Sequence, residues 1–104
     1  MLVSIIMPVY NVECFVERAV LSLLNQSYEN IEIIIVNDAT PDNSMIIIKE
    51  ILKNNHSDVV VRIFNHEFNR GLSEARNTGI LEATGDYLFF LIVMMSYHLM
   101  PLKC

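Results

Sequence analysis

The chain has 104 residues, a mean hydropathy of +0.40 and a formal net charge of −5. This length allows one small domain with its own core, and the apolar composition suggests surface that is covered by something else. With this acidic balance and no cluster of basic residues, nothing favours nucleic acid or an anionic membrane as a partner.

The sequence carries no export or membrane signal. Met1 leads into a short apolar run without a basic flank, and the apolar run 87–95 is shorter than the about 20 residues that span a bilayer. The two cysteines, Cys14 and Cys104, lack metal-ligand spacing. We therefore expect a cytoplasmic protein without a transmembrane segment, membrane-peripheral at most in its full-length form.

The three histidines show no ligand spacing either, and we expect them at the surface or in loops. They are His56, His66 and His98.

Strand and helix patterns alternate from the start of the chain. Leu2–Met7 is a short apolar run that predicts a buried strand stopped by Pro8. Apolar residues then recur at four-residue steps, which predicts an amphipathic helix from about 12 to 26. Ile31–Val36 predicts a second strand, and the polar stretch 37–43 predicts a turn.

The second half of the chain repeats this alternation. We expect helices at Ser44–Lys53, capped by Asp42 or Asn43, and at Ser73–Ala83, and strands at Val59–Phe64 and Tyr87–Ile92. Near-continuous apolar strands joined by helices predict a Rossmann-like, three-layer α/β/α fold with a mainly parallel four-stranded sheet. Ligands of such sheets bind beyond the carboxyl ends of the strands, where this chain places its polar loops.

Four motifs appear in a fixed order along residues 1–91. They are Val3-Ser4-Ile5-Ile6-Met7-Pro8-Val9-Tyr10-Asn11, Ile33-Ile34-Ile35-Val36-Asn37-Asp38, Asn69-Arg70-Gly71-Leu72-Ser73-Glu74-Ala75-Arg76-Asn77-Thr78-Gly79 and Gly85-Asp86-Tyr87. In sequence, order and spacing they resemble the family 2 glycosyltransferases, inverting enzymes of the GT-A fold. The resemblance implies that residues 1–91 are a nucleotide-sugar-binding half-domain. It also implies a donor, commonly a UDP-sugar, whose sugar is transferred to a hydroxyl in the synthesis of cell-surface polysaccharides.

The resemblance also implies nucleotide-binding roles for eight residues, which are Pro8, Val9, Tyr10, Glu13, Asp38, Asn69, Arg70 and Arg76. It places the first three beside the base, Glu13 near the ribose and Asp38 as an acceptor for a base N–H. Asn69 and Arg76, with Arg70 as a further candidate, would lie near the base or the diphosphate, which a guanidinium binds through paired hydrogen bonds. The family usually has Asp where this chain has Asn37.

The main departure from the family begins at residue 92. Members of the family continue with an Asp-x-Asp-Asp motif that holds Mg²⁺ or Mn²⁺ against the diphosphate, whereas this chain has Ile92-Val93-Met94-Met95, without hard oxygen donors. We therefore expect no metal ligand, no catalytic residue and little or no activity in this chain, a donor-binding fragment truncated before the motif.

Three explanations of the apolar tail 92–104 stay open. A one-base shift of codons for Asp-Ser-Asp-Asp can encode Ile-Val-Met-Met, so the tail can be out-of-frame translation. A deliberate truncation with added residues and a naturally degenerate paralogue are the other two. In each case the stretch Leu88–Met95 predicts an exposed apolar edge and self-association.

Two other functions compete with a glycosyltransferase fragment. One is a non-catalytic nucleotide-binding or interaction module. The other is a phospho-receiver-like domain with Asp38 as phosphoryl acceptor, which is disfavoured because Pro8 follows the first strand where an acidic pair is needed. Asp38 could also simply cap a turn.

Overall fold

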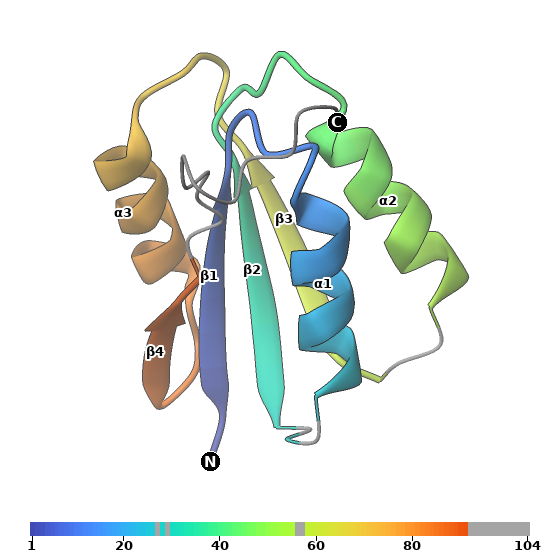
Figure 1. Cartoon of the computed structure of the whole chain (residues 1–104). Coiled ribbons are helices and arrows are strands. Elements are labelled where there is room, and N and C mark those ends of the chain that lie inside the picture. The colour runs from blue at the N-terminus through green and yellow to red at the C-terminus, as the bar shows by residue number, and fades with distance from the viewer. Residues whose placement is uncertain (27, 29, 56–57, 92–104) are drawn as a thin grey trace, which may run out of the picture.

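The computed structural model describes residues 1–26, 28, 30–55 and 58–91. Strands and helices alternate through these residues, as the sequence predicts (Figure 1). The elements are β1 (Val3–Val9), α1 (Val16–Asn25), β2 (Ile31–Asn37), α2 (Ser44–Asn54), β3 (Val60–Asn65), α3 (Leu72–Glu82) and β4 (Tyr87–Phe90). The predicted tail 92–104, with His98 and Cys104, lies outside the described residues, as does His56.

The four strands form one sheet in the order β3-β2-β1-β4, and every neighbouring pair is parallel. The chain moves outward from β1 through β2 to β3 and then crosses back to place β4 on the other side of β1. The direction of winding therefore changes between β1 and β4. In open parallel sheets, such a switch point opens a crevice at the carboxyl ends of the strands, where ligands bind.

Helices cover both faces of the sheet, which gives the predicted three layers. On one face, alternate β1 residues such as Ile5 and Met7 pack with Val16 and Val20 of α1 and Ile48 of α2. On the other face, Ile6 and Ile34 pack with Ala75 of α3. The strands are apolar on both faces because each face meets a helix.

Strand β1 does not stop before Pro8, so the predicted end at Met7 is wrong. The strand runs to Val9, and Pro8 pairs in register with Val36. Ile6 O accepts a hydrogen bond from Leu91 N on the β4 side, and Val9 O accepts one from Asp38 N on the β2 side. The backbone N–H and C=O groups of even-numbered β1 residues therefore face β4. The missing N–H of Pro8 thus faces β4, and the pairing of β1 with β4 ends just before it, at Ile6 and Phe90.

Strand β4 is an outer strand of the described sheet. Its four residues are 39% to 58% exposed, although all four are aromatic or aliphatic. Only β1 pairs with it among the described residues. Within the same ranges, no helix is both long and apolar enough to cross a membrane.

Candidate functional site

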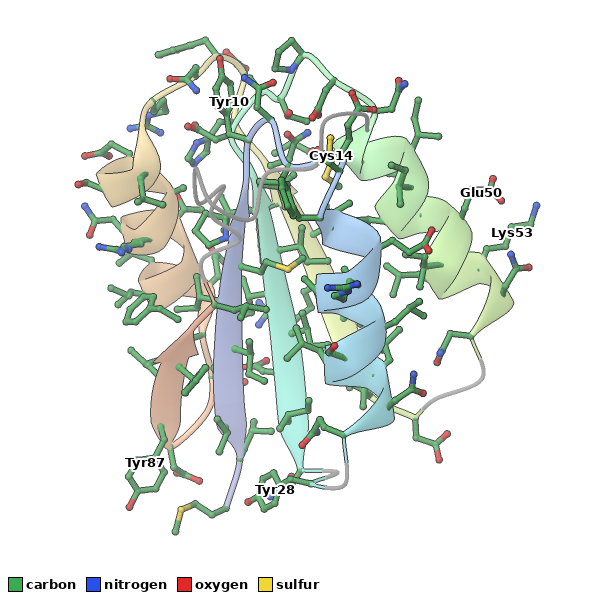
Figure 2. The ribbon with its side chains drawn as sticks, viewed as in Figure 1. Tyr10, Cys14, Tyr28, Glu50, Lys53 and Tyr87 are labelled. Atoms are coloured by element: carbon green, nitrogen blue, oxygen red, sulfur yellow. The ribbon has the colours of Figure 1, made fainter. Side chains whose placement is uncertain are left out.

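Polar loops follow β1, β2 and β3 at the same edge of the sheet. Backbone hydrogen bonds hold the loops together: Asp38 N donates to Val9 O at 3.0 Å, and His66 N donates to Asn37 O at 2.9 Å. Figure 2 shows Tyr10 at this end of the sheet and Tyr28 and Tyr87 at the opposite end. The carboxyl ends of the parallel strands therefore gather the predicted binding residues at one edge.

The Asp38 carboxylate is the centre of this loop cluster. It is only 3% exposed. Its Oδ1 accepts a hydrogen bond from Arg70 N at 2.8 Å and lies 2.8 Å from His66 Nδ1, while Oδ2 accepts one from Gly71 N at 2.9 Å. These contacts of the Asp38 carboxylate shape the loop before α3, and the expected contact from Asp38 to a base stays a prediction.

The charge of Asp38 is maintained despite its burial. Burial raises the pKa of the carboxyl group, but hydrogen bonds from His66 and from the N–H groups of Arg70 and Gly71 outweigh it, so the pKa is lower than its ordinary value of 3.8. Asp38 is therefore an ionised acceptor at neutral pH, and each of its hydrogen bonds is charge-assisted.

Gly71 makes the turn into α3 possible. Its φ of +93° lies in a region that side chains disfavour, although nothing lies within 4 Å of the place a Cβ would take. Glycine is needed here for its backbone conformation and not for space. The turn aims the Arg70 and Gly71 N–H groups at Asp38.

Asp42 joins the loops after β1 and β2. Its Oδ2 accepts a hydrogen bond from Glu13 N at 3.1 Å, and its Oδ1 accepts hydrogen bonds from the hydroxyls of Thr40 and Ser44, both at 2.6 Å. Burial raises the pKa of Asp42, yet these hydrogen bonds bring it below its ordinary value. Of the two predicted caps for α2, Asp42 accepts a bond from Ser44 N, whereas Asn43 makes no side-chain cap bond.

Two residues beside the site adopt a left-handed backbone. Asn11 has φ of 54° and Ala39 has φ of 57°. Such conformations cost a non-glycine residue about 1–2 kcal/mol and tend to occur at functional sites. The loops after β1 and β2 are held in these conformations by the hydrogen bond from Asn11 N to Thr40 Oγ1 at 2.9 Å.

The residues expected beside a base differ in exposure. Pro8 is buried and Val9 is fully buried in the core, so their side chains face the protein. Tyr10 is 43% exposed at the end of β1, and its ring is open to a ligand. Glu13, expected near the ribose, is half-buried at the start of the helical segment.

The other three predicted residues lie in two places. Asn69 Nδ2 donates to Asp38 O at 3.4 Å, and the exposed Arg70 side chain pairs with Glu74 at 3.4 Å. Arg76 lies on α3, where its guanidinium is 5.8 Å from the centre of the Phe90 ring. The structure thus brings Asn69 and Arg70 to Asp38, while Arg76 lies against β4 at the switch point.

Arg76 has a donor with no partner. Its Nε is buried, and within the described part of the chain no other buried side-chain nitrogen or oxygen lacks a hydrogen bond. A buried N–H without an acceptor is costly, and such groups in native proteins commonly await a ligand or an ordered water. Arg76 is therefore suited to bind an anion that approaches α3 beside β4.

His66 is a site residue that the sequence did not indicate. It lies in a loop, one of the two expected places, and its side chain is only 6% exposed. Its Nε2 lies 2.7 Å from Thr78 Oγ1 on α3. Its partners are 28 and 12 residues away in the sequence, and no local pattern reveals pairings of that kind.

Among the described residues, no group of three or more His, Cys, Asp or Glu side chains is placed to hold a metal ion. Positions 92–95, where the resemblance implies the metal ligands, lie outside those residues. The three explanations of the tail and its expected lack of metal binding stay predictions.

Comparisons with known proteins agree with this geometry. The sequence profile of the family described as Glycosyl transferase family 2 matches residues 4–91. A glycosyltransferase of Haemophilus influenzae is 48% identical over 90 residues, which cover 86% of this chain and 35% of that protein. The glycosyltransferase EpsJ of Bacillus subtilis is 52% identical over 86% of this chain and 25% of its own length. The minor teichoic acid biosynthesis protein GgaB of Bacillus subtilis is 43% identical over 90 residues, 10% of its length.

Solved structures show the same arrangement. TarS of S. aureus in complex with UDP-GlcNAc superposes with a TM-score of 0.78 and 26% identity, covering 89% of this chain and 26% of that one. A mannosyltransferase of Pyrobaculum calidifontis in complex with GDP-Man and Mn²⁺ has a TM-score of 0.81 at 24% identity over 88% of this chain and 27% of its own, a likeness of fold alone. This chain therefore spans about a third or less of the relatives and structures it matches.

Proposed function

Since this chain belongs to glycosyl transferase family 2, we propose that residues 1–91 bind the nucleotide of a sugar donor at the carboxyl edge of the sheet. The whole protein then transfers the sugar, with inversion, to a hydroxyl acceptor in glycan synthesis. The observations that carry the proposal are the exposed Tyr10 ring at the end of β1 and the unpartnered Nε of Arg76 on α3, the helix that follows the loop ordered by Asp38.

The chemistry of these groups suits a nucleoside diphosphate. An exposed tyrosine ring offers an apolar face for a base and a hydroxyl at its rim. The Arg76 guanidinium presents fixed N–H donors that match phosphate oxygens, and its partial burial strengthens those bonds. The S. aureus relative, which is described with UDP-GlcNAc, favours a UDP-sugar as donor.

The product class follows from the relatives by analogy. GgaB is named for minor teichoic acid biosynthesis, so an acceptor in a cell-surface polysaccharide is the favoured choice. The donor sugar and the acceptor contact parts of such proteins that this chain does not match, because the matches cover a third or less of each relative.

We expect this chain alone to bind nucleotide without transferring sugar. Ile92-Val93-Met94-Met95 offer no carboxylate where the family holds its metal ion, so nucleotide binding should be weak and independent of Mn²⁺. A non-catalytic nucleotide-binding module is the second candidate function, and the same four residues favour it. A phospho-receiver is disfavoured, because both oxygens of Asp38 already accept hydrogen bonds in a buried position.

Calorimetry with UDP tests the proposal. We expect binding by the wild type that changes less than about twofold when Mn²⁺ is added. Arg76→Gln should weaken it by about tenfold or more, since a hydrogen bond to a charged group contributes about 1.5–3 kcal/mol. Arg18→Gln, the same change at an exposed site on α1, is the matched control and should leave the affinity unchanged.

Three results would contradict the proposal. The first is no detectable UDP binding, and the second is an equal loss in Arg76→Gln and Arg18→Gln, which would indicate a general charge effect. The third is a large gain in UDP affinity when Mn²⁺ is added, which would refute the inference that residues 92–95 hold no metal ion. Turnover of a UDP-sugar by the purified chain would show that it is itself a transferase.

The exposed β4 strand also supports a proposal about assembly. Tyr87, Leu88, Phe89 and Phe90 are apolar side chains on a strand that pairs on one side only among the described residues. Exposed strands of this kind pair with other chains. We therefore expect self-association through this edge in solution.

A further inference from the structure

His66 connects the loop before α3 to α3 itself. Its ring lies between Asp38 Oδ1, 2.8 Å from Nδ1, and Thr78 Oγ1, 2.7 Å from Nε2. The ring is 6% exposed and Asp38 is 4% exposed at the side chain, so water competes little for either bond. The same Asp38 carboxylate accepts the N–H groups of Arg70 and Gly71.

The hydrogen-bond chemistry fixes how the ring is used. An ionised Asp38 can only accept, so His66 Nδ1 must carry a proton. Thr78 Oγ1 also lies 3.1 Å from Glu74 O, which can only accept. If Nε2 is unprotonated, the Thr78 hydroxyl donates to it; if Nε2 is protonated, the hydroxyl turns and donates to Glu74 O. In both states Asp38 keeps its donor from His66.

We propose that His66 is a positioning residue that holds Asp38 in the orientation that presents residues 69–71 to the nucleotide. The Asp38 carboxylate has no other side-chain donor among its contacts in the described residues. Without His66, a buried carboxylate would keep only two backbone donors, which themselves belong to the loop that it must order. The loop and Asp38 would then stabilise each other without an anchor on β3, which ends at Asn65 directly before His66.

The anchor reaches the second half of the binding site. Thr78 lies on α3 two residues after Arg76, so the chain of contacts from Asp38 through His66 ends on the helix that carries the unpartnered Arg76 Nε. His66 therefore fixes the position of residues 69–71, which Asp38 orders, relative to α3, which carries Arg76. This consequence for binding rests on the proposed nucleotide site; the anchoring of the loop does not.

Two amide substitutions separate the two contacts of the ring. Asn places its amide nitrogen near the position of Nδ1 and can keep the bond to Asp38. Gln places its amide near the position of Nε2 and can keep the bond to Thr78 but not the one to Asp38. The readouts are hydrogen exchange of the Arg70 and Gly71 amides by NMR, with the Ile33 and Ile35 amides of β2 as internal controls, and UDP affinity by calorimetry.

We expect His66→Gln to raise exchange at Arg70 and Gly71 by about tenfold or more and to weaken UDP binding by about tenfold, which corresponds to the loss of one charge-assisted bond. His66→Asn, which keeps the Asp38 contact, should keep the exchange of both amides within about twofold. Thr78→Val, which leaves the Asp38 contact in place, should also keep the exchange of both amides within about twofold. The β2 amides should not change in any of these variants.

The proposal is overturned if His66→Asn and His66→Gln behave alike, or if Thr78→Val exposes the two amides as much as His66→Gln does. The first result would mean that the ring only fills space, and the second that loosening of α3 explains the effect. If the wild type fails to bind UDP, the proposed function fails, and amide exchange still decides whether His66 anchors the loop.

Discussion

Gly79 is a position where α3 lies very close to the sheet. A Cβ built on Gly79 would lie 2.3 Å from Ile6 Cγ2, 3.1 Å from Ile6 Cγ1 and 3.2 Å from Ile6 Cβ. Ile6 is fully buried on the central strand β1 and belongs to the cluster that includes Ala75 of α3. A methyl group at position 79 therefore has no free space to enter.

The cost of Gly79→Ala follows from this distance. Ordinary contact begins at 3.4 Å, so the gap to Cγ2 has to open by 3.4 − 2.3, about 1.1 Å. Forcing one extra methyl into a packed core costs about 1–3 kcal/mol. Replacing glycine by alanine in a helix returns up to about 1 kcal/mol. Because 2.3 Å is far shorter than real Cβ contacts, the cost should be about 2–3 kcal/mol, the upper part of that range, and we expect a net loss of about 1–2 kcal/mol in the free energy of unfolding.

Urea unfolding of a double-mutant cycle tests this reasoning. Ile6→Ala alone removes both Cγ atoms and should cost about 2–5 kcal/mol through the cavity it leaves. In the double variant the new methyl enters that cavity, so its cost should be smaller than the sum of the single costs by at least about 1 kcal/mol. Asn77→Ala, an exposed change on the same helix, is the control and should be close to neutral.

Additive effects within about 0.5 kcal/mol would refute the close packing of Gly79 on Ile6. A neutral or stabilising Gly79→Ala would also refute this close packing, because the gain in helix propensity would then meet no opposing cost from the extra methyl group. Since α3 carries Arg76, Gly79→Ala should also weaken UDP binding, and the Ile6→Ala change should restore part of that loss.

Four further predictions concern charge, recognition and assembly. The pKa of Asp38 is below its ordinary value of 3.8, so this carboxylate takes up its proton first in the unfolded chain as the pH falls. The contribution of Asp38 to the free energy of unfolding should be constant above about pH 5 and should drop below about pH 4. The drop in the free energy of unfolding should be less steep in Asp38→Asn. Glu32→Gln should lower the free energy of unfolding in urea by about 2–3 kcal/mol, since buried Glu32 accepts hydrogen bonds from Ser4 Oγ and Thr84 N. An effect below about 0.5 kcal/mol would show that these bonds contribute little. Tyr10→Ala should weaken UDP binding by about tenfold in calorimetry, whereas Tyr28→Ala, at the opposite end of the sheet, should not; equal effects would place the base elsewhere (Figure 2). Phe89→Lys should shift the protein toward monomer in light scattering, and an already monomeric wild type would contradict the expected edge pairing.

The sequence predicted the elements well because their signals are local. The period of apolar residues distinguished the helices from the strands, and the order of strands and helices gave a parallel sheet. The end of β1 was misplaced because the direction of the Pro8 nitrogen depends on which neighbouring strand it faces. That neighbour, β4, comes about 80 residues later in the chain.

The candidate site was predictable only as a set of residues at one edge. The motifs named Tyr10, Asp38 and Arg76, but they did not reveal that Asp38 directs its carboxylate into the protein. They gave no sign that His66 is buried against it, because a lone histidine in a polar loop has the same pattern at the surface.

The sequence by itself determined the type and order of the elements, the family, and which end of the sheet carries polar loops. Those properties depend on residues near one another in the chain. Only the tertiary structure decided that Asp38 organises the loop before α3, that Arg76 keeps an unpartnered donor beside β4, and that Gly79 permits α3 to lie on Ile6. Each of these results from side chains that lie far apart in sequence, whose partners and burial are set by the packing of α3 against the strand order β3-β2-β1-β4.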